Sequence, residues 1–138
     1  IKVTTGVKDV AGNSLNETTK GFSTVPLSVV IGGLEWQFAP ASTNNGYQNL
    51  SNAGSYCSNL SLNSKTDWRL PTITELSTLI DTSVSSPKIV SELRNIVSMR
   101  YSSALEFWSS SDNKVVIFSS GSTGVFNGGV GCQVRCVR

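Results

Sequence analysis

Residues 70–76, LPTITEL, constrain the fold more than any other part of this sequence. Thr72 is placed to be a helix N-cap, because its hydroxyl can accept a hydrogen bond from a free backbone N–H at the start of a helix. Glu75, three residues later, can reach back to the N-cap backbone as the other half of a capping box. An apolar stripe follows at helical spacing: Leu76, Leu79 and Ile80. A helix is therefore predicted to begin at Thr72.

Two further helices are expected, one on either side of this segment. Residues 49–60 predict an amphipathic helix because their apolar side chains lie near helical spacing. These side chains are Leu50, Ala53, Tyr56, Cys57 and Leu60. Another helix is predicted from about Pro87, since proline is favoured in the first turn of a helix. Its inward-facing side chains are expected to be Ile89, Val90, Leu93, Ile96 and Val97.

Strand patterns flank the helical region. Residues 27–31 form an apolar run that predicts a buried strand, and residues 34–38 alternate so that their apolar side chains share one face. Four more strands are predicted toward the C-terminus, at residues 107–108, 115–118, 124–126 and 133–137. Helices in the middle with strands at both ends predict an α+β domain over residues 27–138.

The first 26 residues have a different pattern. Residues 2–5 and 21–25 read as two short strands around a turn-rich segment, and Pro26 marks the boundary. Two strands alone are marginally stable in water, so they need a sheet to join. The string GVKDVAGNSLNETTKGFSTV resembles the final strands of bacterial Ig-like domains, which implies that residues 1–26 end an Ig-like β-sandwich or form a linker ribbon. The alternative is a β-ribbon that belongs to the main domain.

The composition argues against most enzymes and against nucleic-acid binding. The 138 residues include no histidine, which removes the commonest general base and the most frequent metal ligand. We therefore expect a protein that is not an enzyme and uses no cofactor or metal. A net charge of +2 is too small for electrostatic capture of nucleic acid, and no apolar run approaches the roughly 18 residues of a membrane helix. The sequence starts without methionine, so we expect a piece of a longer protein.

Three strings carry a resemblance to a known family: SYCSNLSLNSKTDWRLPTITELSTLID, FWSSS and VRCVR. Their order resembles that of the Lcl C-terminal-type domain of bacterial surface proteins along nearly all of residues 32–138. The WRLPT box is also similar to that of formylglycine-generating enzymes, and both families resemble the broader C-type-lectin-like fold. The resemblance implies this fold and says less about function.

The resemblance also implies roles for individual residues. Trp68 would be a core anchor, and Arg69 would make a buried, multidentate bridge to carbonyls or to a carboxylate. Cys57 would pair with Cys136 in a disulfide, and the alternative is two buried free thiols. Cys132 would then be a solitary thiol in a glycine-rich loop.

Two activities of related folds lack their motifs here. Calcium-dependent lectins use EPN, QPD or WND strings, which are absent, and Trp108 is followed by Ser109. An oxidase like the formylglycine-generating enzymes is a rival that would need two cysteines close together. In a strand, Cys132 and Cys136 would lie about 13 Å apart, beyond the roughly 7 Å limit for a disulfide. A calcium–sugar site and a redox pair are both disfavoured.

The loops near the C-terminus have the composition of a binding surface. Residues 109–113 and 119–132 are rich in small polar side chains that offer adaptable hydrogen bonds, and Phe126 would supply an exposed aromatic anchor. In the C-type-lectin-like fold these final loops form the exposed ligand face. The expected ligand-binding residues are Ser110, Ser111, Asp112, Asn113, Ser119, Ser120, Ser122, Thr123, Val125, Phe126, Asn127 and Val130.

The same segment fits a pattern of diversification. Several proteins that it resembles are variable targets of diversity-generating retroelements, which randomise adenines at Asn-type codons. Such randomisation never yields Lys, Glu, Gln, Met or Trp, and residues 115–132 contain none of these. Residues 49–64 also lack them, so the alternative is that turn-rich segments favour small residues.

Together these observations predict a display protein that binds a target protein or glycan on a cell surface, as a variable protein of a diversity-generating retroelement. We expect an extracellular location, on a cell or virion surface. The alternative is a bacterial surface adhesin of fixed specificity for glycans or glycosaminoglycans, which would need a clustered basic face. The arginines are scattered along the sequence: Arg69, Arg94, Arg100, Arg135 and Arg138.

Overall fold

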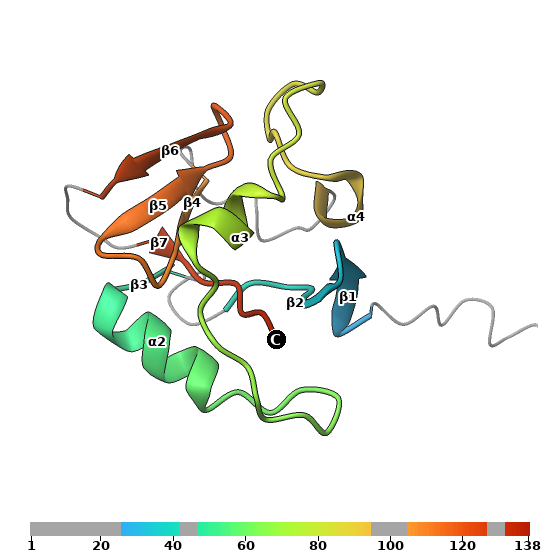
Figure 1. Ribbon diagram of the computed structural model, residues 1–138, viewed down its shortest axis with the longest axis vertical. Coiled ribbons are helices and arrows are strands. Elements are labelled where there is room, and N and C mark those ends of the chain that lie inside the picture. Colours follow the sequence, from blue (N-terminus) through green and yellow to red (C-terminus); the bar gives the residue numbers. More distant parts are fainter. Residues whose placement is uncertain (1–25, 42–46, 95–104, 127–131) are drawn as a thin grey trace, which may run out of the picture.

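The computed structural model describes residues 26–41, 47–94, 105–126 and 132–138 (Figure 1). The expected Ig-like strands in residues 1–25 lie outside this part of the chain. The described elements are, in order, β1 (Ser28–Ile31), β2 (Leu34–Gln37), β3 (Tyr47–Gln48), α2 (Leu50–Ser58), α3 (Ile73–Ser77), α4 (Ser91–Arg94), β4 (Glu106–Trp108), β5 (Lys114–Ile117), β6 (Ser122–Val125) and β7 (Cys132–Gln133). Helices and strands are both present, which confirms the α+β class.

The strands form two sheets. β1 and β2 make an antiparallel hairpin, and the other five strands form a sheet in the order β3-β7-β4-β5-β6. β4 and β7 run parallel, whereas the other neighbouring strands of this sheet are antiparallel. β6 is the last described strand at one edge, so its outer backbone groups face away from the sheet.

The β1–β2 hairpin turns at Gly32 and Gly33, whose φ angles of +61° and +84° are open to glycine because it has no Cβ. Val29 and Ile31 pack against the core, but Val30 is 68% exposed. The predicted strand at residues 27–31 is therefore present, but the prediction that it is buried is wrong for Val30. The hairpin covers the core with one face only, so the alternate side chains face solvent.

α2 and α3 begin where the sequence predicts. In α2, the N-cap residue Asn49 accepts a hydrogen bond through Oδ1 from Asn52 N at 2.9 Å. In α3, Thr72 Oγ1 accepts from Glu75 N at 3.1 Å, and Glu75 Oε2 accepts from Thr72 N at 2.9 Å, which confirms the capping box. α3 ends after five residues, and the chain continues in a turn that keeps Leu79 buried.

The third predicted helix is wrong at its start. Pro87 lies in a bend before α4, and Ile89 forms a β-bridge with Ile80. Ile89 and Leu93 are fully buried. Their spacing of four residues is thus compatible both with a continuous helix and with a β-bridge followed by the short helix α4. The bridge pairs two segments that are close in the fold, and this tertiary contact outweighs local helical spacing. Two predicted inward residues lie outside the described part of the chain: Ile96 and Val97.

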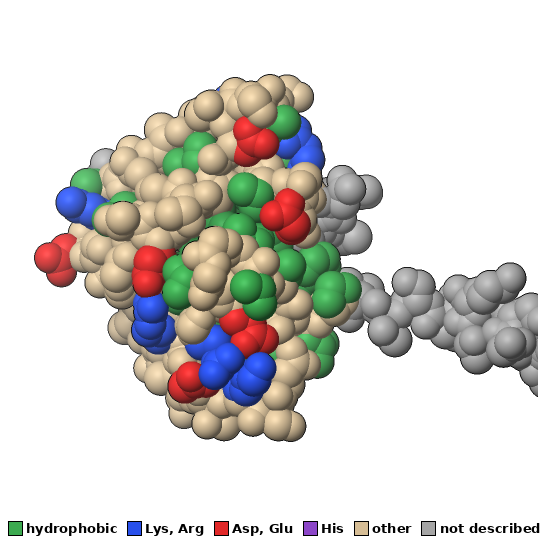
Figure 2. Space-filling view, turned by 45° about the vertical axis from the view of Figure 1, so that its right-hand side comes forward, with side chains coloured by type: hydrophobic (Ala, Val, Ile, Leu, Met, Phe, Trp, Pro, Cys, Tyr) green, Lys and Arg blue, Asp and Glu red, His purple; other side chains and the backbone are tan. Residues whose placement is uncertain are grey.

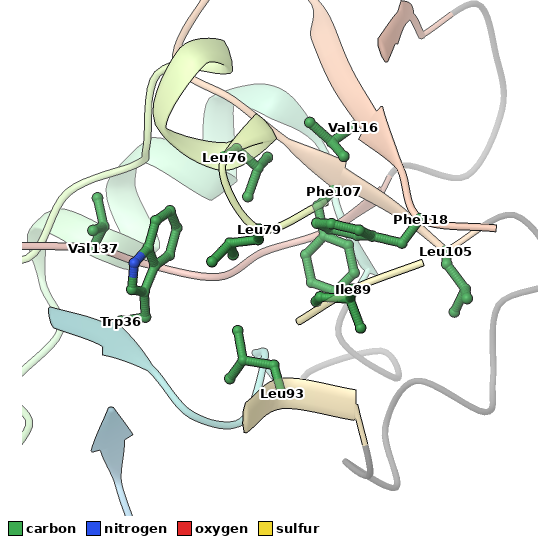
Figure 3. Close-up of a cluster of buried hydrophobic side chains, with 10 residues drawn as sticks. All are labelled: Trp36, Leu76, Leu79, Ile89, Leu93, Leu105, Phe107, Val116, Phe118 and Val137. Atoms are coloured by element: carbon green, nitrogen blue, oxygen red, sulfur yellow. The ribbon is translucent and has the colours of Figure 1, made fainter. Parts of the chain in front are cut away.

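Two hydrophobic clusters lie on the two faces of the five-stranded sheet. Phe107 of β4 and Val116 of β5 face one cluster, and their chain neighbours Trp108 and Val115 face the other. Cluster I (Figure 3) comprises Trp36, Leu76, Leu79, Ile89, Leu93, Leu105, Phe107, Val116, Phe118 and Val137. Cluster II comprises Ala41, Ala53, Cys57, Trp68, Leu70, Trp108, Val115, Cys132, Val134 and Cys136. Trp68 is 2% exposed, which confirms it as a core anchor.

The C-terminal segment joins the two halves of the domain. Gln37 N in β2 donates to Cys136 O at 2.9 Å. Val137 forms one β-bridge with Trp36 and another with Arg69. Cys136 is also bonded to Cys57 of α2, which confirms the disulfide that the resemblance implied. The predicted strand at residues 133–137 is thus divided into β7 and a bridged segment that follows it.

Candidate functional site

The turn between β4 and β5 lies beside the end of β6. Phe126 N donates to Asn113 O at 2.9 Å, and Asn113 Nδ2 donates to Phe126 O at 2.8 Å. The φ of Asn113 is +57°, a left-handed conformation in which asparagine is enriched. Six of the expected binding residues meet here, and we call them the turn surface: Ser110, Ser111, Asp112, Asn113, Val125 and Phe126.

Hydrogen bonds to the end of the WRLPT box and to the residue that follows it hold this turn in place. Ser110 N donates to Pro71 O at 2.7 Å, and Ile73 N donates to Ser111 Oγ at 3.2 Å. The Ser111 hydroxyl therefore serves one of the free N–H groups at the start of α3. Sequence reasoning missed this role, because no local pattern connects residues 71–73 with residues 110–111.

The buried side chain of Ser109 bonds to the backbone on both sides of the turn. This residue is fully buried, and its Oγ donates to Lys114 O at 2.8 Å and accepts from Ser111 N at 3.2 Å. Ser109 N also donates to Lys114 O at 3.1 Å. These bonds fix the backbone of the turn, while the side chains of Ser110 and Asp112 stay exposed.

Phe126 is less accessible than the sequence predicts. Its ring packs edge-to-face on Trp108, with the centroids 5.0 Å apart, and it belongs to the margin of cluster II. The expectation of an exposed aromatic anchor is therefore wrong, because the ring is half-buried. Side chains alternate along a strand, so the preceding Val125 points the other way and is 55% exposed.

Other expected binding residues lie at the opposite end of the β5–β6 hairpin. Ser119 and Ser120 belong to its turn, where the hydroxyls of Ser120 and Ser122 are 2.6 Å apart. Ser122 is three residues from Val125, so the two ends are separated by roughly 10 Å of strand. Thr123 is exposed between them. Two expected residues lie outside the described part of the chain: Asn127 and Val130.

A comparison with known families decides what kind of domain this is. The model of the Lcl C-terminal domain matches residues 31–138, which include the WRLPT box, the turn surface and the disulfide. The chain belongs to the Lcl C-terminal domain family. No curated protein and no solved structure matches the chain.

The family is consistent with the C-type-lectin-like fold and with the α+β arrangement of β1 to β7. For function, it supports at most a ligand-binding domain of the type found in variable proteins, and it names no target. In this Lcl C-terminal domain, the end of the WRLPT string and the residue that follows it support the turn surface, since the backbone of Pro71 and of Ile73 bonds to the turn.

Many charged groups of this Lcl C-terminal domain are paired with each other. Figure 2 shows Lys and Arg side chains beside Asp and Glu side chains on one face. Arg138 lies 2.6 Å from Glu35 and from Asp67, and Lys65 lies 3.3 Å from Glu35. The Ser28 hydroxyl, followed by the Arg138 guanidinium, lowers the pKa of Glu35 to about 2. These basic side chains are therefore neutralised by adjacent carboxylates.

Arg69 makes the expected bridge to a carboxylate, but at an exposed position. Arg69 pairs with Glu75 through two bonds of 2.8 Å, but its predicted burial is wrong, because 48% of the side chain is exposed. The Arg69 guanidinium lowers the pKa of Glu75 to about 2. Arg135 is the buried arginine: its Nη1 donates to Gln37 O at 2.7 Å and also to Phe38 O. Burial lowers the Arg135 pKa to about 9, so it remains a cation at neutral pH.

The thiol of Cys132 is unreactive. Cys132 is buried and unpaired, and burial raises its pKa to about 12, so little thiolate forms at neutral pH.

Within the described ranges, no three His, Cys, Asp or Glu residues gather in a way that could hold a metal ion. No helix in those ranges has the length and apolar character needed to cross a membrane.

Proposed function

We propose that this Lcl C-terminal domain is a binding module without enzymatic activity, which contacts a target protein or glycan through the turn surface. The observation that carries the proposal is the combination of exposed Ser110, Asp112, Asn113 and Val125 side chains with a backbone held by buried bonds. Small polar side chains can adapt their hydrogen bonds to a partner. The fixed backbone lowers the conformational entropy lost on binding.

The finer proposal is that the segment after β4 is diversified by a retroelement and displayed on a cell or virion surface. β5 is mostly buried and β6 is mostly exposed. We therefore expect diversified positions in β6 rather than in β5. Changes at Ser122, Thr123 and Val125 would alter the surface, whereas changes at Val115 and Val116 would disturb the core. An imperfect nucleotide repeat that differs at adenines of the exposed codons would support this reading.

A polyanion such as a glycosaminoglycan is a poorer target. Such a ligand needs several unpaired basic groups on one face. Here three basic side chains already form ion pairs with carboxylates: Lys65, Arg69 and Arg138. A fourth, Arg135, is buried. We therefore favour a target that is recognised by shape and neutral hydrogen bonds.

The proposal is tested with the oxidised domain on an array of glycans and cell-surface ectodomains. We expect saturable binding to at least one target, with weak dependence on salt and no change when EDTA removes divalent metal ions. The same domain after reduction and unfolding serves as the control for nonspecific adhesion. The absence of saturable binding across the array, or its loss with EDTA, would contradict the proposal.

A further inference from the structure

A different surface, formed by α2 and the residues that follow it, contains a pocket of about 380 Å³. This volume lies within the range of about 300–1,000 Å³ that is typical of small-molecule sites, but the pocket is shallow and open to solvent, since four of its six lining residues are exposed. The pocket is lined by Asn52, Ser55, Tyr56, Asn59, Leu60 and Ser61. None of these side chains is charged. The lining combines two amides, two hydroxyl groups of serine, one phenol and one aliphatic side chain.

The helix places most of this lining on one face. Three of the lining residues follow Asn52 by three, four and seven positions: Ser55, Tyr56 and Asn59. This is the spacing of neighbours along one side of a helix. Cys57 points away from this side, is fully buried and is bonded to Cys136. The disulfide therefore fixes α2 to the C-terminal segment from behind the pocket.

The aromatic wall is also held in position. Gln37 Nε2 donates to the Tyr56 hydroxyl at 2.7 Å, and Gln37 Oε1 accepts from Cys136 N at 3.1 Å. Gln37 is itself buried, and Tyr56 and Leu60 pack against cluster II. A ligand would therefore meet a preorganised apolar wall, which lowers the cost of binding.

Polar groups with unused hydrogen-bonding capacity surround this wall. Within the described residues, the Asn52 amide and the Ser61 hydroxyl make no side-chain hydrogen bond. Asn59 Nδ2 donates to Ser55 O at 2.8 Å, which leaves the Asn59 carbonyl oxygen as an acceptor. An amide offers both donors and an acceptor, and so can match a hydroxyl that donates and accepts at once.

We propose that this pocket binds a neutral sugar residue. A sugar ring has an apolar C–H face that can pack on Tyr56 and Leu60, and hydroxyl groups at its edge that suit Asn52, Asn59 and Ser61. The absence of charge in the lining disfavours sulfated or acidic sugars. A single sugar in an open site binds weakly, so we expect a Kd of about 1 mM. This site is separate from the turn surface and does not depend on the function proposed for it.

The test is a titration of the oxidised, isotope-labelled domain, followed by backbone amide NMR. The probes are the methyl glycosides of glucose, galactose, mannose and N-acetylglucosamine, each at up to about 50 mM, well above the expected Kd. At least one probe should shift the resonances of residues 52–61 saturably. The absence of shifts with all four probes, or shifts confined to the turn surface, would overturn the proposal.

Substitutions identify the groups that bind. Tyr56→Phe keeps the ring and should retain binding, whereas Tyr56→Leu should abolish the shifts. Asn52→Ala, at an exposed position with no side-chain bond to lose, should weaken binding about fivefold, the effect of one hydrogen bond. The matched control is Ser58→Ala, on the same helix but outside the lining, which should bind as the unchanged domain does. Equal binding by Asn52→Ala, Tyr56→Leu and the control would overturn the proposal.

Discussion

Two carboxylates connect separate segments of the domain. Glu75 joins the capping box of α3 to Arg69, and Glu35 joins β2 to the C-terminal Arg138. Their pKa values are lowered from 4.5 to about 2, by the Arg69 guanidinium for Glu75 and by the Ser28 hydroxyl, then Arg138, for Glu35. Each carboxylate must therefore be ionised for the native contacts to form fully.

Acid should destabilise the domain through these two residues. Because folding lowers their pKa values, their contribution to stability is complete above pH 5 or so and is lost as the pH falls toward 2. About half of the Arg69 side chain is exposed, so solvent screening limits the Glu75 contribution to about 1 kcal/mol. Thermal unfolding from pH 6 to pH 2.5 should show a falling Tm.

A comparison of variants isolates the Glu75 contribution. Glu75→Gln can still accept a bond from Thr72 N but cannot pair ionically with Arg69, so its Tm should fall less steeply with acid. Glu92→Gln, at an exposed carboxylate on α4, is the control and should follow the unchanged domain. Identical acid profiles for the domain and Glu75→Gln would contradict this assignment.

At the scale of elements, the start of α3 and the β4–β5 turn form one unit. Ser111→Ala should destabilise the domain by about 1 kcal/mol, because it leaves Ile73 N without its acceptor. Ser110→Ala should change stability little, since Ser110 bonds to Pro71 through its backbone. Urea unfolding of the two variants measures the difference. Equal stability of the two variants would show that the hydroxyl contact is not formed.

Elements with local signals were predictable from the sequence, and elements that depend on distant partners were not. The apolar spacing of residues 49–60 and the capping box at Thr72 are local signals, so α2 and α3 begin as predicted. Pro87 looked like a helix start, but the β-bridge between Ile89 and Ile80 decides the local structure there. Likewise, composition marked the turn residues, whereas only the strand register shows that Ser122 is far from the turn surface.

At the scale of the whole molecule, the disulfide ties α2 to the end of the chain. Residues 57 and 136 are separated by 79 positions, and closing a loop of this length stabilises the fold by about 4 kcal/mol in the chain-entropy picture. The double variant Cys57→Ala/Cys136→Ala should therefore lower Tm by roughly 10 °C or more. Cys132→Ala, the control for loss of a buried sulfur, should cost only about 1 kcal/mol. Equal losses in the two variants would refute a stabilising crosslink.

The difference in burial between Arg69 and Arg135 also arises at this scale. Arg69 and Arg135 are the same residue type, and each stands beside apolar neighbours in the sequence. Only the packing of the C-terminal segment against β2 makes Arg135 the buried one. The resemblance gave the disulfide and the core role of Trp68, but it gave the buried position to the wrong arginine.

The binding of surface variants to a target found on the array tests whether the turn surface is the binding site. Ser110→Arg and Val125→Arg place a bulky charge on exposed parts of the turn surface, and Thr82→Arg places one on an exposed loop elsewhere. We expect each turn-surface variant to weaken binding at least about tenfold, or about 1.4 kcal/mol, while the Thr82 variant binds normally. Unchanged affinity of both turn-surface variants, with their folds intact, would contradict it.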